Sequence, residues 1–222
     1  MDWQALELSL RLTGTALLFL LPIGLLIGRT LAYGRSRHRH WFEAAIALPL
    51  VLPPTVLGFY LLEGFGADGP LGALYGRLFD RPLAFSFEGL VLAAIIFNLP
   101  FAVQPMARSF EAIPPDIRNA AACSGLGPFQ SFLRIEVPLA LPGILSAMVL
   151  CFAHSIGEFG VLLMVGGAIP GETRTIAIAI YDRVQAFDEA GAARMSAFLL
   201  LMSLLAIGAS YAMTRRKADD RR

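Results

Sequence analysis

Charged side chains are scarce in this chain of 222 residues, and lysine is nearly absent. Only 16% of the residues are charged, against 56% that are hydrophobic, and the one lysine is Lys217, close to the C-terminus. A phosphate-binding P-loop requires a lysine directly after a glycine-rich turn, so the sequence holds no nucleotide site of that kind. A composition this apolar is typical of helical membrane proteins rather than of soluble domains. The net charge of +1 indicates no nucleic-acid partner.

Cysteine and histidine are also rare. Of the two cysteines, Cys123 lies in a polar loop and Cys151 in an apolar segment, so we expect both to be free thiols. His154 is the one histidine within an apolar segment, and Glu158 follows it four residues later. Two such ligands, without a HExxH pattern or a further histidine nearby, argue against a zinc site. We therefore expect no metal ion and no cofactor on this chain.

Five hydrophobic segments are long enough to cross a bilayer. A helix needs about 20 apolar residues for this, whereas barrel strands are shorter and alternate in polarity. We therefore expect a polytopic all-α protein, with one domain over residues 1–222. The N-terminal segment has no basic region before it and no small-residue cleavage site after it, so we expect a retained span rather than a signal peptide. The expected spans are about 8–28, 44–63, 89–107, 139–165 and 194–214.

The placement of the arginines predicts the orientation of these spans. Successive spans cross the membrane in opposite directions, so the loops between them lie on alternate sides. Twelve of the 18 arginine and lysine residues then lie on one side of the membrane, and six lie on the other. Because cytoplasmic loops carry the excess of arginine and lysine, we expect the N-terminus outside and the C-terminus inside. The loop 108–138 then lies in the cytoplasm. The outer loops, about 63–88 and 166–193, are too short to be separate domains.

The loop 108–138 carries a motif with defined spacing. It reads Asn119-Ala120-Ala121, three residues, Gly125, nine residues, Ile135, one residue, Val137-Pro138. This pattern resembles the EAA loop of ABC importer permeases, which begins with Glu-Ala-Ala and ends with Leu-Pro, so Asn119 and Val137 are departures from it. The resemblance implies that the loop couples the membrane subunit to a separate ATPase chain. Apart from the resemblance, the stretch also fits an ordinary amphipathic loop between two spans.

Prolines and one glycine in this loop predict a helix, a turn and a second helix. The first helix is expected over about 116–124, because two prolines and an aspartate suit a first helical turn. Gly125 ends it in the left-handed conformation of a helix C-cap. Pro128 opens the second helix, over 129–135, and Pro138 is expected to stop it before the fourth span.

The fourth span contains ionisable residues at a depth where charge is costly. His154 and Glu158 are expected to share one helix face, with Ser155 beside them. Two interpretations stay open: a patch that faces a transport pathway or a dimer interface, and a hydrogen-bonded pair between packed helices. Prolines and Asn98 also interrupt the second and third spans, either where backbone lines a cavity or as simple kinks. The candidate pathway or gate residues are Thr55, Asn98, His154, Ser155 and Glu158.

Several segments resemble one subfamily, the molybdate permeases, and the resemblance extends over nearly the whole chain. They are residues 48–58 (LPLVLPPTVLG), 157–160 (GEFG), 169–175 (IPGETRT) and 177–181 (AIAIY). Sulfate and tungstate permeases have looser versions of these segments. The spans themselves show no cage of donors for a tetrahedral dianion, so the oxyanion is implied by the resemblance alone.

The resemblance also implies an assembly in a bacterial inner (cytoplasmic) membrane, surrounded by lipid. The permease pairs with a second copy of itself, two cytoplasmic ABC ATPase subunits bind ATP and magnesium below, and a periplasmic oxyanion-binding protein docks above. Candidate docking residues for that binding protein are Glu172, Thr173 and Arg174. The alternatives are a permease for tungstate or sulfate and, from another class, a membrane-embedded enzyme or scaffold.

Overall fold

The computed structural model describes residues 1–34 and 37–219, with side chains as far as position 205 and at position 208. Within these ranges every regular element is helical, which confirms the all-α prediction. The elements are α1 (Trp3–Tyr33), α2 (Arg39–Val51), α3 (Pro54–Phe65), α4 (Pro70–Phe79), α5 (Phe87–Glu111), α6 (Pro115–Cys123), α7 (Pro128–Ser131), the π-helical turn η1 (Phe132–Glu136), α8 (Val137–Gly157), α9 (Gly160–Gly166), α10 (Ile176–Gln185) and α11 (Glu189–Asp219).

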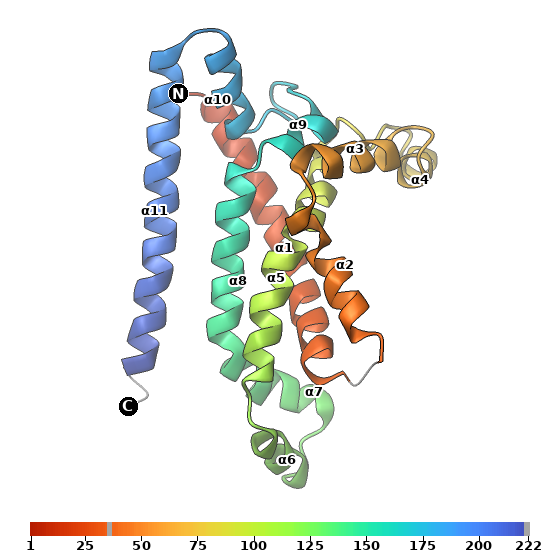
Figure 1. Ribbon diagram of the computed structural model, residues 1–222, viewed down its shortest axis with the longest axis vertical. Coiled ribbons are helices and arrows are strands. Elements are labelled where there is room, and N and C mark those ends of the chain that lie inside the picture. Colours follow the sequence, from red (N-terminus) through yellow and green to blue (C-terminus); the bar gives the residue numbers. More distant parts are fainter. Residues whose placement is uncertain (35–36, 220–222) are drawn as a thin grey trace.

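The centre of the molecule is formed by α1, α5 and α8, which lie side by side (Figure 1). Small residues allow α1 and α5 to approach closely. A Cβ placed on Gly28 of α1 would lie only 3.0 Å from the backbone nitrogen of Ala107 in α5, and one on Gly24 would lie 2.9 Å from Met106 Sδ. Membrane helices associate through such small residues because lipid provides little hydrophobic driving force.

The helix lengths agree with a membrane protein. Among the described residues, α1, α5 and the continuous helix Pro128–Gly157 are each long and apolar enough to cross a membrane, and the bent pair α2–α3 is a fourth candidate. The fifth expected span, 194–214, lies in α11, which runs along the bundle (Figure 1). Several of its side chains, at 206, 207 and 209–214, are outside the described residues, so the count of five stays a prediction.

The second expected span, 44–63, is broken rather than continuous. Helix α2 ends at Val51, and α3 begins at Pro54 after a bend of 109°. Pro53 and Pro54 cause this break, since proline has no backbone N–H to donate and disfavours helical conformation in the residue before it. The predicted interruption of this span by prolines is therefore confirmed, whereas the interruption expected in the third span was wrong, because α5 is continuous through Asn98 and Pro100.

The fourth expected span, 139–165, is broken as well. Helix α8 ends at Gly157, Glu158 has an extended backbone, and α9 begins at Gly160. Oε1 of Glu158 accepts a hydrogen bond from the backbone N–H of Val161 at 2.9 Å, so this carboxylate caps the start of α9. The expectation that His154 and Glu158 share one helix face was wrong, because the helix stops between them.

The two breaks lie against each other. A Cβ placed on Gly58 of α3 would lie 2.7 Å from Cβ of Met164 in α9, and one on Gly160 would lie 2.8 Å from Cβ of Pro54. These glycines let α3 cross α9 at close range. The broken segments thus form one packed unit, and it sits toward the α10 end of the bundle (Figure 1).

The bundle has two distinct ends. The N-terminus, α9 and α10 lie at one end, and α6 lies at the other, beyond the ends of α1, α5 and α8 (Figure 1). We refer to them below as the α10 end and the α6 end. Helix α4 projects sideways from the α10 half of the molecule.

Candidate functional site

The α6 end carries the motif singled out in the sequence. Pro115 and Asp116 lie in the first turn of α6, and the helix ends at Cys123. Gly125 has a φ of +76°, and its N–H donates to the carbonyl of Ala122 at 3.0 Å. The predicted helix and its left-handed glycine cap are both confirmed.

The motif residues of α6 present mostly backbone and small side chains to solvent. Asn119, Ala120 and Gly125 are exposed, whereas Ala121 is buried against the rest of the loop. A Cβ placed on Gly125 would meet no atom within 4 Å, so the space over its backbone is open. Helix α6 projects from the bundle (Figure 1), and another protein's surface therefore has direct access to it.

The second half of the motif does not end where the sequence predicts. Helix α7 passes through η1 into α8, so Pro138 lies in the first turn of α8 and stops nothing. An internal proline would normally clash with the carbonyl four residues earlier. The π-helical turn over 132–136 widens the backbone at this point, which accommodates the proline ring. Ile135 is half-buried in that turn, and Pro138 is exposed.

A partly buried ion pair fixes this loop to α1, and the sequence interpretation missed it. Nε of Arg29 donates to Oε2 of Glu136 at 2.6 Å, and Nη2 donates to Oε1 at 3.1 Å. The side chain of Glu136 is only 3% exposed. The sequence did contain a signal for this pair. Glu136 lies at the start of one apolar segment and Arg29 at the end of another, and opposite charges at the same side of two spans often pair with each other.

Aromatic rings extend this contact to α6. The guanidinium of Arg29 lies 5.4 Å from the ring centre of Phe132, and that of Arg118 in α6 lies 3.6 Å from the ring centre of Tyr33. Both distances are within the range of cation–π attraction. Tyr33 also donates a hydrogen bond to the carbonyl of Phe110 at 3.1 Å. The end of α1 is therefore held to α5, α6 and η1 together.

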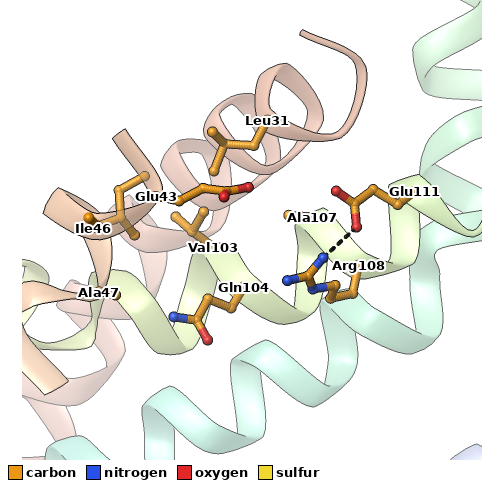
Figure 2. A pocket seen from close by; sticks show the side chains of 10 residues that line it. Leu31, Glu43, Ile46, Ala47, Val103, Gln104, Ala107, Arg108 and Glu111 are labelled. Carbon is orange, nitrogen blue, oxygen red and sulfur yellow. Dashed lines mark hydrogen bonds and ion pairs between the residues drawn. The ribbon is translucent and has the colours of Figure 1, made fainter. Parts of the chain in front are cut away.

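A cleft at the α6 end lies between α1, α2 and α5, and Figure 2 shows the side chains that line it. Nη1 of Arg108 donates to Oε2 of Glu111 at 2.9 Å, and Arg39 pairs with Glu111 and also with Glu43. None of the side chains of α2 is buried, and the Arg39–Glu111 pair helps to attach α2 to α5. The arginines of the cleft, Arg39 and Arg108, are already paired with glutamates. Their positive charge is therefore not free to bind a dianion.

Two of the candidate pathway residues meet in the core. Nδ2 of Asn98 in α5 donates to Oγ of Ser155 in α8 at 2.7 Å and to the carbonyl of Ala94 at 2.8 Å. Asn98 is fully buried, and its Oδ1 accepts no hydrogen bond in this structure. The pair joins two central helices and lies inside the protein rather than on a surface.

The other candidate pathway residues take no part in this hydrogen bond. The ring of His154 stacks against Phe101, with 4.4 Å between the ring centres, and lies 5.3 Å from Phe97. Glu158 caps α9 as described above. Thr55 is exposed in the first turn of α3. The structure therefore distributes the five candidates over the core and the two breaks.

At the α10 end, the three candidate docking residues differ in exposure. Glu172 is exposed, whereas Thr173 is fully buried, with its hydroxyl donating to the carbonyl of Gly166 at 2.6 Å and accepting from the N–H of Ile169 at 3.0 Å. Thr173 thus shapes the loop from inside, and its expected surface position was wrong. Arg174 is partly exposed and forms ion pairs with Asp182 at 3.2 Å and Asp2 at 3.5 Å.

The corner between α10 and α11 is stabilised separately. The N–H of Gly191 donates to Asp188 at 2.9 Å, and Arg183 forms an ion pair with the same carboxylate. Both contacts lower the pKa of Asp188 below its usual range, and the hydrogen bond from Gly191 has the larger effect. The corner holds Phe187 with a φ of +58° and its side chain 90% exposed, so an aromatic ring projects from this end of the molecule.

Comparison with known proteins decides the family. Residues 21–219 match the family described as "Binding-protein-dependent transport system inner membrane component". The chain belongs to this family. It is therefore an inner membrane component of a transport system that depends on a binding protein, and the sequence resemblance to importer permeases is confirmed.

Relatives of this inner membrane component match almost its whole length. It is 45% identical to the molybdenum transport system permease protein ModB of Azotobacter vinelandii, over 98% of this chain and 96% of the relative. It is 37% identical to the ModB protein of Escherichia coli strain K12, over 93% of this chain and 90% of the relative. A probable sulfate transport system permease protein of Prototheca wickerhamii is 27% identical over 90% of this chain and 78% of the relative.

Solved structures show the same fold at low sequence identity. A chain of a bacterial ABC transporter involved in alginate import aligns with a TM-score of 0.76 and 18% identity, covering 96% of this chain and 78% of that chain. A chain of the inward-facing MetNI methionine ABC transporter aligns with a TM-score of 0.70 and 16% identity, covering 97% and 93%. The inner membrane component therefore has the fold of ABC transporter permeases.

Proposed function

We propose that this chain is the membrane-spanning permease of an ATP-driven importer for molybdate. The observation that carries the proposal is the 45% identity to a molybdenum transport permease over nearly the whole chain. The exposed α6 with its left-handed Gly125 supports the ATP-driven part, because it presents a backbone surface suited to a partner. Tungstate and sulfate are the alternative substrates, and an enzyme or scaffold role is the alternative class.

The partner at α6 is a separate ATPase that binds ATP and magnesium. The only lysine of this chain is Lys217, so a P-loop must come from another subunit. Asn119, Ala120 and Gly125 provide the contact, while Ala121, Ile135 and Pro138 shape the loop beneath it. In this arrangement the α6 end faces the cytoplasm and the N-terminus faces outward, in keeping with the arginine distribution.

The transport pathway runs beside the two broken spans, between this chain and a second copy of it. Helix interruptions at membrane depth are tolerated where the backbone lines a cavity or is buried in protein. Thr55 at the start of α3 and Glu158 at the start of α9 mark these interruptions. Asn98, His154 and Ser155 support them from the core. Lipid surrounds the outward-facing leucines of α1.

The oxyanion-binding protein docks at the α10 end. Glu172 and Phe187 are exposed there, and Arg174 is partly exposed beside them. Exposed aromatic rings and arginines are typical of residues that dominate protein–protein binding energy. Thr173 contributes from below the surface by holding the loop in shape.

The test is ATP hydrolysis by the reconstituted complex of this permease with its ATPase and binding protein. We expect molybdate-loaded binding protein to stimulate hydrolysis more than tungstate or sulfate does. Stronger stimulation by sulfate-loaded binding protein would indicate that the substrate is sulfate rather than molybdate. No stimulation by any of the three, together with failure of the chain to bind an ATPase, would overturn the importer.

A further inference from the structure

Helix α1 makes specific contacts with both candidate docking regions. At its α6 end it holds the coupling loop, and at its α10 end it holds the loop that contains Glu172. These two regions lie at opposite ends of the molecule (Figure 1), and the contacts at each end are of different kinds.

The contact at the α6 end is bidentate and partly buried, with the side chain of Arg29 32% exposed. Arg29 meets Glu136 through two nitrogen–oxygen contacts, and Glu136 is nearly inaccessible to solvent. Arg118 of α6 lies against Tyr33 of α1 as well. A bidentate arginine–carboxylate pair fixes both distance and angle, so the coupling loop has little freedom to turn relative to α1.

The contact at the α10 end rests on hydrogen bonds and an ion pair. The buried Oγ of Ser9 accepts from the N–H of Ile176, the first residue of α10, at 2.8 Å. Asp2 caps α1 by accepting from Ala5 at 3.0 Å, and it also pairs with Arg174. The loop 169–175 is therefore anchored to the first two turns of α1.

Between these ends α1 is one helix of 31 residues, which at the α-helical rise corresponds to about 46 Å. Pro22 removes one internal hydrogen bond, but Gly24 and Gly28 follow it and pack directly on α5. The helix is thus supported by a neighbour at the point where it would otherwise bend most easily.

We propose that α1 is a mechanical link that transmits movement of the ATPase-docking loop to the binding-protein-docking loop, with Arg29 and Glu136 as its positioning residues. The inference rests on the proposed function, because it assigns partners to both ends. Movement of α6 turns η1 and with it Glu136. The ion pair passes that displacement to α1, and Ser9 and Asp2 pass it to the loop 169–175.

The test removes the ion pair without leaving a buried charge. A single change at Arg29 leaves the buried Glu136 unpaired, which is often strongly destabilising, whereas replacing both members of such a pair by apolar residues is often neutral or stabilising. The informative variant is therefore Arg29→Met combined with Glu136→Leu. Glu43→Gln is the matched control, because it weakens an ion pair at the same end of the bundle that does not involve α1.

The readout is a thiol at the far end of α1. Glu172→Cys in a Cys123→Ser background is reacted with a membrane-impermeant maleimide, with the ATPase either nucleotide-free or bound to a non-hydrolysable ATP analogue. We expect the nucleotide to change the reaction rate by about fivefold in the parent and in the Glu43→Gln control, which is the lower end of the affinity changes found between coupled sites. In the double variant we expect this difference to disappear.

Two results would overturn the link: an unchanged nucleotide effect in the double variant, or no nucleotide effect in the parent. The assay contains no oxyanion and no binding protein. An error in the proposed substrate would therefore appear in the hydrolysis experiment and leave this one intact. If the ion pair only stabilises the fold, the double variant will respond to nucleotide as the parent does.

Discussion

Gly125 is the residue where the coupling loop depends most on backbone conformation. We expect Gly125→Val to weaken ATPase binding and transport, because a left-handed φ costs an L-residue about 1–2 kcal/mol and a β-branched one more. The matched control is Gly127→Val, since Gly127 is also exposed and open but has a φ of −66°. ATPase pull-down and uptake by whole cells measure the effect. Equal loss in both variants would assign it to bulk rather than to the turn.

Glu158 is expected to act on structure rather than on the anion. Its carboxylate caps α9, and a carboxylate repels a dianion, most of all at low dielectric. Glu158→Gln retains an acceptor for the cap, so the competition among molybdate, tungstate and sulfate for uptake should stay the same. Glu158→Ala removes the acceptor and should destabilise the protein by about 1 kcal/mol. A shift in anion preference with Glu158→Gln would place this residue on the transport pathway.

The predictions made from sequence for single residues succeeded where the local conformation depends on one residue and its neighbours in the sequence. The left-handed turn at Gly125 follows from the absence of a Cβ and from its place at a helix end. The burial of Glu136 depends instead on Arg29, which is 107 positions away in the sequence. A local sequence pattern does not show which residues meet over such a separation, so the sequence analysis predicted no partner for Arg29.

At the level of elements, the contact of Asn98 with Ser155 joins α5 to α8. We expect a double-mutant cycle with Asn98→Ala and Ser155→Ala to give a coupling of about 0.6 kcal/mol, the average for polar pairs between membrane helices. Unfolding in mixed detergent is the measurement. Ser146→Ala is the control partner, because the Ser146 hydroxyl bonds to the carbonyl of Pro142 in its own helix. Coupling of Asn98 to Ser146 as large as to Ser155 would contradict a direct contact.

The broken spans show what hydropathy can and cannot predict about an element. The apolar runs of the second and fourth spans were found because burial in lipid requires them. The bends depend on local hydrogen bonding of the backbone. Pro53 has no N–H to donate, and the side chain of Glu158 accepts a hydrogen bond from the N–H of Val161. Two adjacent prolines were a usable signal for the first bend. The second depends on a glutamate side chain that replaces a helical hydrogen bond, and in sequence it looked like a charge on a helix face.

At the scale of the whole molecule, the two cysteines provide a test of orientation. Cys123 is exposed on α6, whereas Cys151 is buried in the core, so the unmodified chain has one accessible thiol among its two cysteines. We expect an impermeant maleimide to label Cys123 only after cells are permeabilised. Arg77→Cys, on the exposed face of α4, should react in intact cells. The reverse pattern would place α6 outside and remove the proposed ATPase contact.

The order of the helices and the separation of the two ends were predictable from the sequence as a whole. Alternating apolar and arginine-rich segments place α6 and the N-terminus on opposite sides, as they are in the structure (Figure 1). The packing of α3 across α9 was not predictable, because it depends on Gly58 and Gly160 meeting from different parts of the chain. The extra residue in η1 had no recognisable pattern of its own.

That extra residue determines the direction in which α6 points around the long axis of α8. The helix is continuous from Pro128 to Gly157, and each residue of an α-helix turns the chain by about 100°. A π-helical turn contains one residue more than an α-helical path. Deleting one residue between 132 and 136 would let the turn relax to α geometry and would rotate everything before it by about 100°. The docking loop would keep its sequence, its caps and its exposed glycine. It would, however, point in a different direction around the axis of α8, so a partner bound at this end of the bundle would no longer meet it.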